Sequence, residues 1–149
     1  MTLTCYVNGV KRRFEITPDE YLADTLRQSG FISVRKGCDE SACGACTVLL
    51  DDEPVLSCAL LSAKAEGKHI TTVEGIPEDA KKLAYYFGEE GADQCGYCHV
   101  GFALTCYALK KKFKNPTDEQ IKDFVVGNLC RCSGYQAQIK AIKAYLKED

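Results

Sequence analysis

Cysteine is the residue type in this sequence best suited to chemistry, and the 149 residues include ten of them. Four in the first half follow the order Cys38-x4-Cys43-x2-Cys46-x11-Cys58. Cys-x4-Cys-x2-Cys with a distant fourth cysteine is the plant-type spacing for a [2Fe–2S] cluster. The spacing therefore predicts such a cluster, and a structural zinc site on the same four thiolates is the alternative.

The loop that carries the first three of these cysteines must turn tightly to bring their sulfur atoms together. Gly37 and Gly44 supply the conformational freedom for such turns. Amide groups of a loop like this point at sulfur, and their hydrogen bonds raise the reduction potential of a cluster by stabilising added negative charge. We therefore expect the loop both to hold the cluster and to tune it.

A second group of cysteines consists of two close pairs, Cys95-x2-Cys98 and Cys130-x-Cys132. One pair lies at the start of an expected helix and the other lies in the loop before a later helix, so four thiolates could meet at one end of a helix bundle. The spacing alone leaves three interpretations open: an iron–sulfur cluster, a zinc site or free thiols.

Residues 95–99 also match Cys-x-x-Cys-His, the attachment signature of c-type haem. We reject that interpretation, because such attachment takes place outside the cytosol and residues 1–14 do not resemble an export signal. It would also leave Cys130 and Cys132 without a role. Four cysteines complete the site by themselves, so we expect His99 to be a polar residue near the cluster or at an interface.

The remaining candidate residues have structural explanations. Cys5 alternates with other apolar residues on one face of an expected strand, and Cys106 lies on an apolar helical stripe, so both are expected core residues. The lysine run of residues 110–112 is expected to form a solvated helix end, where cations suit the helix dipole, rather than a docking patch.

Composition narrows the class of protein. The 46% hydrophobic and 27% charged residues are typical of a globular chain, but the absence of Trp and a 9% aromatic content give a modest core. The net charge of −2 argues against nucleic-acid binding. No apolar run approaches the roughly 18 residues of a membrane span. We expect a cytoplasmic protein whose cysteines are ligands rather than disulfides.

The first half of the sequence predicts strands with one helix. Residues 2–7 and 10–16 alternate around Asn8-Gly9 and predict a β-hairpin. A capping box with Pro at the first helical position, residues 17–20, predicts a helix over 18–29. Further strands are expected at residues 47–50, 54–57 and 69–73.

The second half changes to helical periodicity after residue 77. Helices are expected near residues 78–90, 98–113, 118–126 and 136–147, the third of them opened by a Thr117 and Gln120 capping box. Four short helices indicate a small bundle. The fold class is therefore α+β, with a strand-rich domain over residues 1–76 and an all-α domain over residues 77–149.

Three passages resemble a known family, and the match extends over nearly the whole chain. They are Lys36-Gly37-Cys38 through Cys43-Gly44-Ala45-Cys46-Thr47-Val48, then Gln94-Cys95-Gly96-Tyr97-Cys98, and Gly127-Asn128-Leu129-Cys130-Arg131-Cys132-Ser133-Gly134-Tyr135. With them the sequence resembles the small [2Fe–2S] iron–sulfur subunit of the xanthine dehydrogenase family of molybdenum hydroxylases. The resemblance implies a ferredoxin-like β-grasp domain over residues 1–76. It also implies a four-helix bundle over residues 77–149 that binds its own [2Fe–2S] cluster through Cys95, Cys98, Cys130 and Cys132.

The same resemblance implies an electron-transfer subunit of an oxidoreductase complex, with no catalytic residues of its own. A molybdopterin cofactor would lie in a large partner subunit and FAD in another. Gln94 and Cys132 would be nearest the pterin, and electrons would pass from molybdenum through the bundle cluster and the ferredoxin-like cluster to flavin. The alternative is a free-standing two-cluster ferredoxin or redox sensor.

Two passages depart from the family pattern. His99-Val100 stands where relatives commonly have Thr-Pro, and residues 39–42 replace the usual small, glycine-containing stretch. Neither change removes a cysteine. The missing Pro is expected to alter the helix start beside the cluster and the contact with the large subunit.

Overall fold

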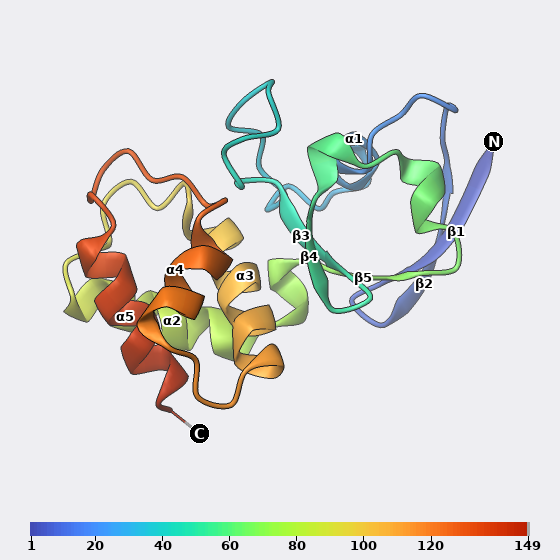
Figure 1. The fold of residues 1–149 in the computed structure, drawn as a ribbon. Helices are drawn as coiled ribbons and strands as arrows, with labels where there is room; N and C mark the ends of the chain where they lie inside the picture. The colour runs from blue at the N-terminus through green and yellow to red at the C-terminus, as the bar shows by residue number, and fades with distance from the viewer. Residues whose placement is uncertain (149) are drawn as a thin grey trace.

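The computed structural model describes residues 1–148 as a strand-rich half beside a helical half (Figure 1). The strands are β1 (Thr2–Val7), β2 (Val10–Glu15), β3 (Thr47–Leu50), β4 (Glu53–Leu56) and β5 (His69–Thr71). The helices are α1 (Leu22–Gln28), α2 (Pro77–Glu89), α3 (His99–Lys112), α4 (Asp118–Val125) and α5 (Gln136–Leu146). Short 3-10 turns cover Ser57–Ala59, Ser62–Ala65 and Val73–Gly75.

The strands form one mixed five-stranded sheet in the order β2-β1-β5-β3-β4. All neighbours are antiparallel except β1 and β5, which run parallel. Apolar side chains of β1 alternate inward, and α1 packs beside the first two 3-10 turns, so a core forms between them. Cys5 is fully buried in this core, which confirms that it is a packing residue. The α+β fold class is confirmed.

Both hairpin turns of the sheet follow from short sequence signals. Asn8 and Gly9 have φ values of 51° and 79°, and Asp51 and Asp52 have 50° and 69°. Type I′ turns need positive φ at both central residues, and Asn, Asp and Gly adopt it most readily. The first hairpin is therefore as predicted, with Thr2 paired to Glu15.

The prediction of a helix over residues 18–29 is wrong at its start. The Thr17 amide donates to Glu20 Oε2, as a capping box requires, but α1 begins only at Leu22. Tyr21 is extended and forms an isolated bridge with Leu61, and the Leu22 amide donates to Leu60 O at 2.8 Å. This tertiary contact keeps Tyr21 extended, so α1 begins later than the capping box predicts.

The helical half forms where the periodicity predicts it. Helix α2 packs against α3 and α5, and α4 packs against α3. Their apolar sides enclose a second core that contains Phe87, Phe102 and the fully buried Cys106, which confirms Cys106 as a core residue. Within residues 1–148 no helix is both long enough and apolar enough to cross a membrane.

The expected capping box at α4 is present. The Gln120 amide donates to Thr117 Oγ1 at 3.2 Å, and the Thr117 amide donates to Gln120 Oε1 at 2.9 Å. We predict that Thr117→Ala lowers the free energy of unfolding by about 1 kcal/mol, because one helix amide loses its acceptor. Thermal unfolding would show this as a lower Tm, with Lys122→Ala on the exposed side of the same helix as the control. An unchanged Tm in Thr117→Ala would contradict the prediction.

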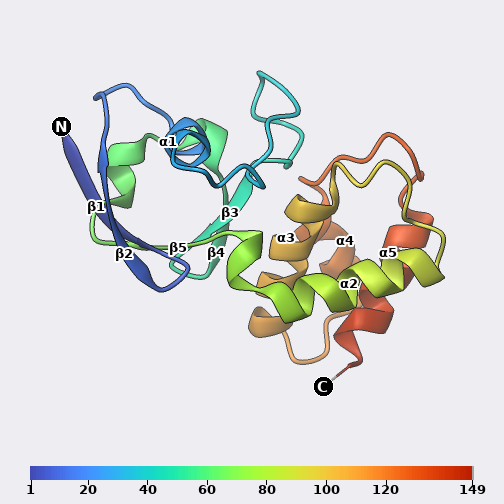
Figure 2. The ribbon, with the colours of Figure 1, turned by 180° about the vertical axis from the view of Figure 1, so that it is seen from behind.

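The two halves share an apolar contact between β3 and α3. Leu49 of β3 packs with Leu104 and Ala108 of α3 and with Ile76, all of them buried. Two views show that the loop before β3 lies at the same end of the molecule as the loops before α3 and α5 (Figures 1 and 2). These are the loops that carry most of the cysteines, so the fold brings them to one end.

Candidate metal centres

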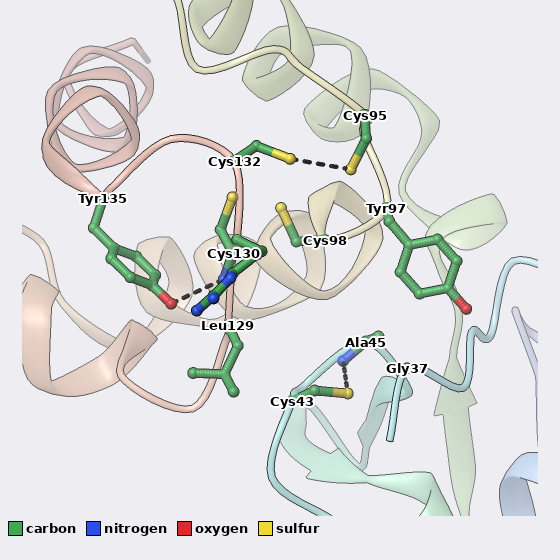
Figure 3. A pocket seen from close by; sticks show the side chains of 11 residues that line it. Gly37, Cys43, Ala45, Cys95, Tyr97, Cys98, Leu129, Cys130, Cys132 and Tyr135 are labelled. Atoms are coloured by element: carbon green, nitrogen blue, oxygen red, sulfur yellow. Dashed lines mark hydrogen bonds between the residues drawn. The ribbon is translucent and has the colours of Figure 1, made fainter. Parts of the chain in front are cut away.

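The four candidate ligand cysteines of the helical half line one pocket of about 480 Å³. Cys95 and Cys98 lie before and at the N-terminus of α3, and Cys130 and Cys132 lie in the loop between α4 and α5. The Cys95 and Cys132 sulfur atoms are 3.5 Å apart, and Cys98 and Cys130 also interact through their side chains. Figure 3 shows all four sulfur atoms pointing into the same space. The structure thus brings together every residue of the second predicted site.

The four candidate ligand cysteines of the strand-rich half also lie as two interacting pairs. Cys38 interacts with Cys43, and Cys46 interacts with Cys58, which follows β4 in a 3-10 turn. The Ala42 amide donates to Cys38 Sγ at 3.4 Å, and the Ala45 amide donates to Cys43 Sγ at 3.5 Å. Loop amides therefore point at sulfur.

The pairing of the thiols matches the ligand arrangement of a [2Fe–2S] cluster. In a [2Fe–2S] cluster each of the two irons takes two cysteines, whereas tetrahedral zinc takes all four ligands around one point. Two pairs in each half fit the two irons of a [2Fe–2S] cluster.

The pKa values of the thiols depend on burial and on hydrogen bonds from the loop amides. Hydrogen bonds from the Ala42 and Cys43 amides lower the pKa of Cys38 to about 7. Burial raises the pKa of Cys46 to about 11 and that of Cys98 to about 12. These two thiols therefore keep their protons at neutral pH until a metal displaces them, so metal binding and proton release are coupled.

The loop that carries Cys130 and Cys132 is held in a fixed shape. Tyr135 lies in the left-handed region at φ 72°, which a bulky side chain rarely adopts. Its hydroxyl accepts the Cys130 amide proton at 2.9 Å (Figure 3). This bond closes the loop directly before α5 and fixes the backbone at Cys130.

A side-chain clamp joins the two halves beside the pocket. Arg35 Nη1 donates to Gly96 O at 2.6 Å and to Tyr97 O at 2.8 Å, and its guanidinium lies 5.1 Å from the centre of the Tyr97 ring. The Tyr97 hydroxyl donates to Lys36 O at 2.8 Å. Sequence analysis missed the role of Arg35. The only sequence feature that could have drawn attention to Arg35 is its position three residues before Cys38. That position does not reveal a contact with a loop about 60 residues away.

Backbone also meets backbone between the two cysteine loops, in a contact that we call the glycine seam. It consists of Gly44 in one half and Gly101 and Gly127 in the other. A Cβ atom on Gly44 would lie 2.3 Å from Gly127 O, and one on Gly101 would lie 2.3 Å from Gly44 O. Next to the seam the Leu129 amide donates to Cys43 O at 2.9 Å. Residues adjacent to both predicted sites are thus in direct contact.

Gln94 and Cys132 lie at an exposed edge of the site. Both are exposed, as is Cys95, whereas Cys98 and Cys130 are half-buried. Cys132 lines the pocket, and Gln94 precedes Cys95 outside the residues that line it. The two residues predicted to lie nearest a pterin are therefore accessible to a partner.

His99 and Val100 are the first two residues of α3. Cys98 precedes the helix, and the His99 amide donates to Gly96 O at 3.3 Å. The His99 ring packs edge-on against Phe87 with centroids 4.8 Å apart, and Nε2 lies 3.9 Å from Asp93 Oδ1. Helix α3 therefore begins beside the cluster site without the family's Pro.

The lysine run lies at the end of α3, as expected, and two of its lysines also form ion pairs with the strand-rich half. Lys111 Nζ is 3.0 Å from Asp52 Oδ1, and Lys112 Nζ is 3.5 Å from Glu53 Oε2. Both carboxylates belong to the β3–β4 hairpin, so these ion pairs bridge the two halves. Exposed pairs of this kind contribute about 0–1 kcal/mol each, so the apolar contact and the glycine seam are the main connections.

Comparison with known protein families divides the chain into two matches. Residues 5–74 match the 2Fe-2S iron-sulfur cluster binding domain, and residues 72–143 match the [2Fe-2S] binding domain. The two matches together cover both cysteine sets. The chain therefore contains two [2Fe–2S] domains.

Individual relatives agree with the family matches. The chain is 45% identical over 138 residues to the nicotinate dehydrogenase small FeS subunit of Eubacterium barkeri, covering 91% of this chain and 88% of the relative. It is 38% identical over 146 residues to the xanthine dehydrogenase iron-sulfur-binding subunit of Escherichia coli O157:H7, covering 95% and 92%. The crystal structure of quinoline 2-oxidoreductase from Pseudomonas putida 86 matches with a TM-score of 0.89 and 36% identity, covering 99% of this chain and 94% of that one. This chain belongs to the small [2Fe–2S] subunits of the molybdenum hydroxylase family, which are electron-transfer subunits of multi-subunit oxidoreductase complexes.

Proposed function

We propose that this chain relays single electrons between a molybdopterin centre on a large partner subunit and FAD on another partner subunit. The observation that carries the proposal is the contact between two cysteine sets, in which Leu129, next to Cys130, donates to the backbone of Cys43. When bound, the clusters supply one-electron storage, so that a two-electron oxidation on the partner is drained in single steps through the bundle site, the ferredoxin-like site and flavin.

The eight paired cysteines are the proposed cluster ligands. Cys38 with Cys43 and Cys46 with Cys58 would each hold one iron of the ferredoxin-like cluster in residues 1–76. Cys95 with Cys132 and Cys98 with Cys130 would do the same in the bundle of residues 77–149. The side-chain interaction within each pair supports this division. In this scheme Cys5 and Cys106 remain core residues.

The remaining residues of the site would position the clusters and exclude water. Loop amides donate to Cys38 and Cys43, which offsets the charge that reduction adds. The Arg35 clamp and the glycine seam hold the two loops together, which keeps the transfer distance short. The exposed Gln94 and Cys132 would face the molybdopterin of the large subunit, which leaves the ferredoxin-like domain for the FAD subunit.

We place this complex in the cytoplasm. Eight of the ten cysteines are proposed cluster ligands rather than members of disulfides, as a reducing compartment favours. The net charge of −2 supports protein partners rather than nucleic acid.

Purification through a tag on this chain tests the proposed position in the relay. We expect a larger chain, a flavin-binding chain, molybdenum and FAD to co-purify in equal amounts. A chain that carries both clusters but purifies alone, without molybdenum or flavin, would contradict the relay and favour a free-standing ferredoxin. The Cys106→Ala variant, which changes only a core residue, should co-purify with the same partners and serves as the control.

Removal of the clusters should destabilise the protein. The fold withdraws the Cys46 and Cys98 thiols from water and places each beside its partner cysteine, so part of the metal-binding energy is folding energy. We predict that the apo chain, prepared anaerobically with a chelator and reductant, has a Tm lower than that of the holo chain by about 10 °C or more. An apo chain that unfolds at the same temperature would contradict this coupling.

A further inference from the structure

Gln138 is a polar residue whose side chain is buried in the protein interior. It lies on α5 near the start of the helix and is 0% exposed. Its Oε1 has no hydrogen-bond partner in the described part of the chain. Burial of an amide with an unsatisfied oxygen costs stability, so such a residue calls for a compensating role.

The other end of the Gln138 amide makes a specific contact. Nε2 donates to Ser133 Oγ, and Ser133 Oγ lies 3.2 Å from Cys130 Sγ. A serine hydroxyl has one proton to give and can accept at its oxygen. Because Gln138 fills an acceptor position of Ser133, the hydroxyl proton is left for the sulfur of Cys130. A cysteine bound to iron has no proton, so in the loaded site serine must be the donor.

We propose that Gln138 and Ser133 form a hydrogen-bond relay that raises the reduction potential of the bundle cluster through Cys130. The relay rests on the proposed ligation of iron by Cys130. A donor to a cysteine sulfur stabilises the reduced state more than the oxidised state, because reduction adds negative charge. Ser133 is the donor, and Gln138 is a positioning residue that acts through the orientation of the Ser133 hydroxyl.

The relay adds to the backbone donors of the same sulfur and does not replace them. The Cys132 and Ser133 amides also donate to Cys130, and Tyr135 fixes the Cys130 amide. These bonds remain when the Ser133 hydroxyl is removed, so the cluster should still assemble. Cys130 points toward Cys98 and Cys132 in the pocket (Figure 3), and the relay connects it to Gln138 on α5.

Two variants and two matched controls test the relay. Ser133→Ala removes the donor, and Gln138→Met removes the group that orients it while filling a similar volume. Ser133→Thr retains the hydroxyl, and Gln136→Met makes the same amide-to-thioether change at an exposed position two residues earlier on α5. Ser133 is only half-buried, so Ser133→Ala keeps the test decisive if Gln138→Met fails to fold.

The readout is an EPR-monitored redox titration of the complex purified through this chain. In Ser133→Ala and Gln138→Met we expect the bundle cluster to be about tenfold harder to reduce, a fall of about 59 mV for a one-electron couple. The ferredoxin-like signal should keep its potential, and Ser133→Thr and Gln136→Met should match wild type. Loss of the bundle signal in Cys98→Ser assigns which signal is which.

The outcomes separate this inference from the proposed function. Two signals with an unchanged bundle potential in Ser133→Ala would overturn the relay alone. An equal fall in Ser133→Thr and Ser133→Ala would overturn it as well, because the hydroxyl would then have no part in the effect. The absence of iron–sulfur signals from the wild-type complex would overturn the proposed ligation and the relay together.

Discussion

Cys98→Ser should remove one of the two iron–sulfur signals and leave the other intact. Cys98 lies among the bundle cysteines, and burial raises its pKa to about 12, so metal binding there requires iron to displace the thiol proton and leave a soft thiolate. Serine keeps the volume but offers a harder oxygen that is more difficult to deprotonate. We expect iron content to fall by about half, with EPR after dithionite reduction showing only the ferredoxin-like cluster.

Cys106→Ala is the matched control for this change. Cys106 lies on α3, the helix that Cys98 precedes, is fully buried in the core, and does not line the cysteine pocket. Its removal should leave both signals and cost only packing energy, about 1 kcal/mol. Loss of both signals in a folded Cys98→Ser protein would show that the two sites are not independent and would contradict the two-domain account.

Gly44→Ala should separate the two cysteine loops. Gly44 has φ +75°, and an added Cβ would lie 2.3 Å from Gly127 O and 2.8 Å from the side-chain nitrogen Nδ2 of Asn128. Two effects add: about 1–2 kcal/mol for a side chain in the left-handed region and about 1–3 kcal/mol for overpacking. We expect a lower Tm and a weaker magnetic interaction between the two reduced clusters, measured by EPR.

Gly67→Ala separates backbone strain from the clash. Gly67 has a nearly equal φ of +71°, but an added Cβ there would meet nothing within 4 Å. This variant should lose only the stability that the left-handed backbone costs and should keep the wild-type magnetic interaction. If Gly44→Ala and Gly67→Ala behaved alike, close approach at the glycine seam would not be what positions the two clusters.

Local signals in the sequence predicted much of the fold. Asn8-Gly9 predicted the first hairpin, because few other dipeptides adopt two successive positive φ values. The Thr117 and Gln120 capping box predicted the start of α4, because both of its hydrogen bonds form within one turn. Such features depend on residues close in the sequence, and the structure confirms them.

Features that depend on distant residues were not predictable in this way. The α1 prediction failed at its start because Tyr21 pairs with Leu61, forty residues later. The strand expected at 69–73 is shorter, because Val73 belongs to a 3-10 turn. In both cases a tertiary contact or a turn replaced the conformation that local propensity favours.

The candidate site shows the same division. Spacing identified the cysteines, because ligand chemistry constrains their separation within a loop. The glycine seam could not be predicted, because the need for glycine at Gly44 and Gly101 arises only from the contact between two segments that are distant in the sequence. Gln138 had no sequence signal either, because a lone Gln in a helix is normally expected at the surface.

The composition and spectra of the complex test the central claim most directly. The complex, purified anaerobically through a tag on this chain, would be assayed for iron, inorganic sulfide and zinc, and its EPR spectrum recorded after dithionite reduction. We predict two irons and two sulfides for each cysteine set, with two distinct [2Fe–2S] signals. Zinc in place of iron, without sulfide and without an EPR signal, would contradict the assignment of this chain as an electron relay.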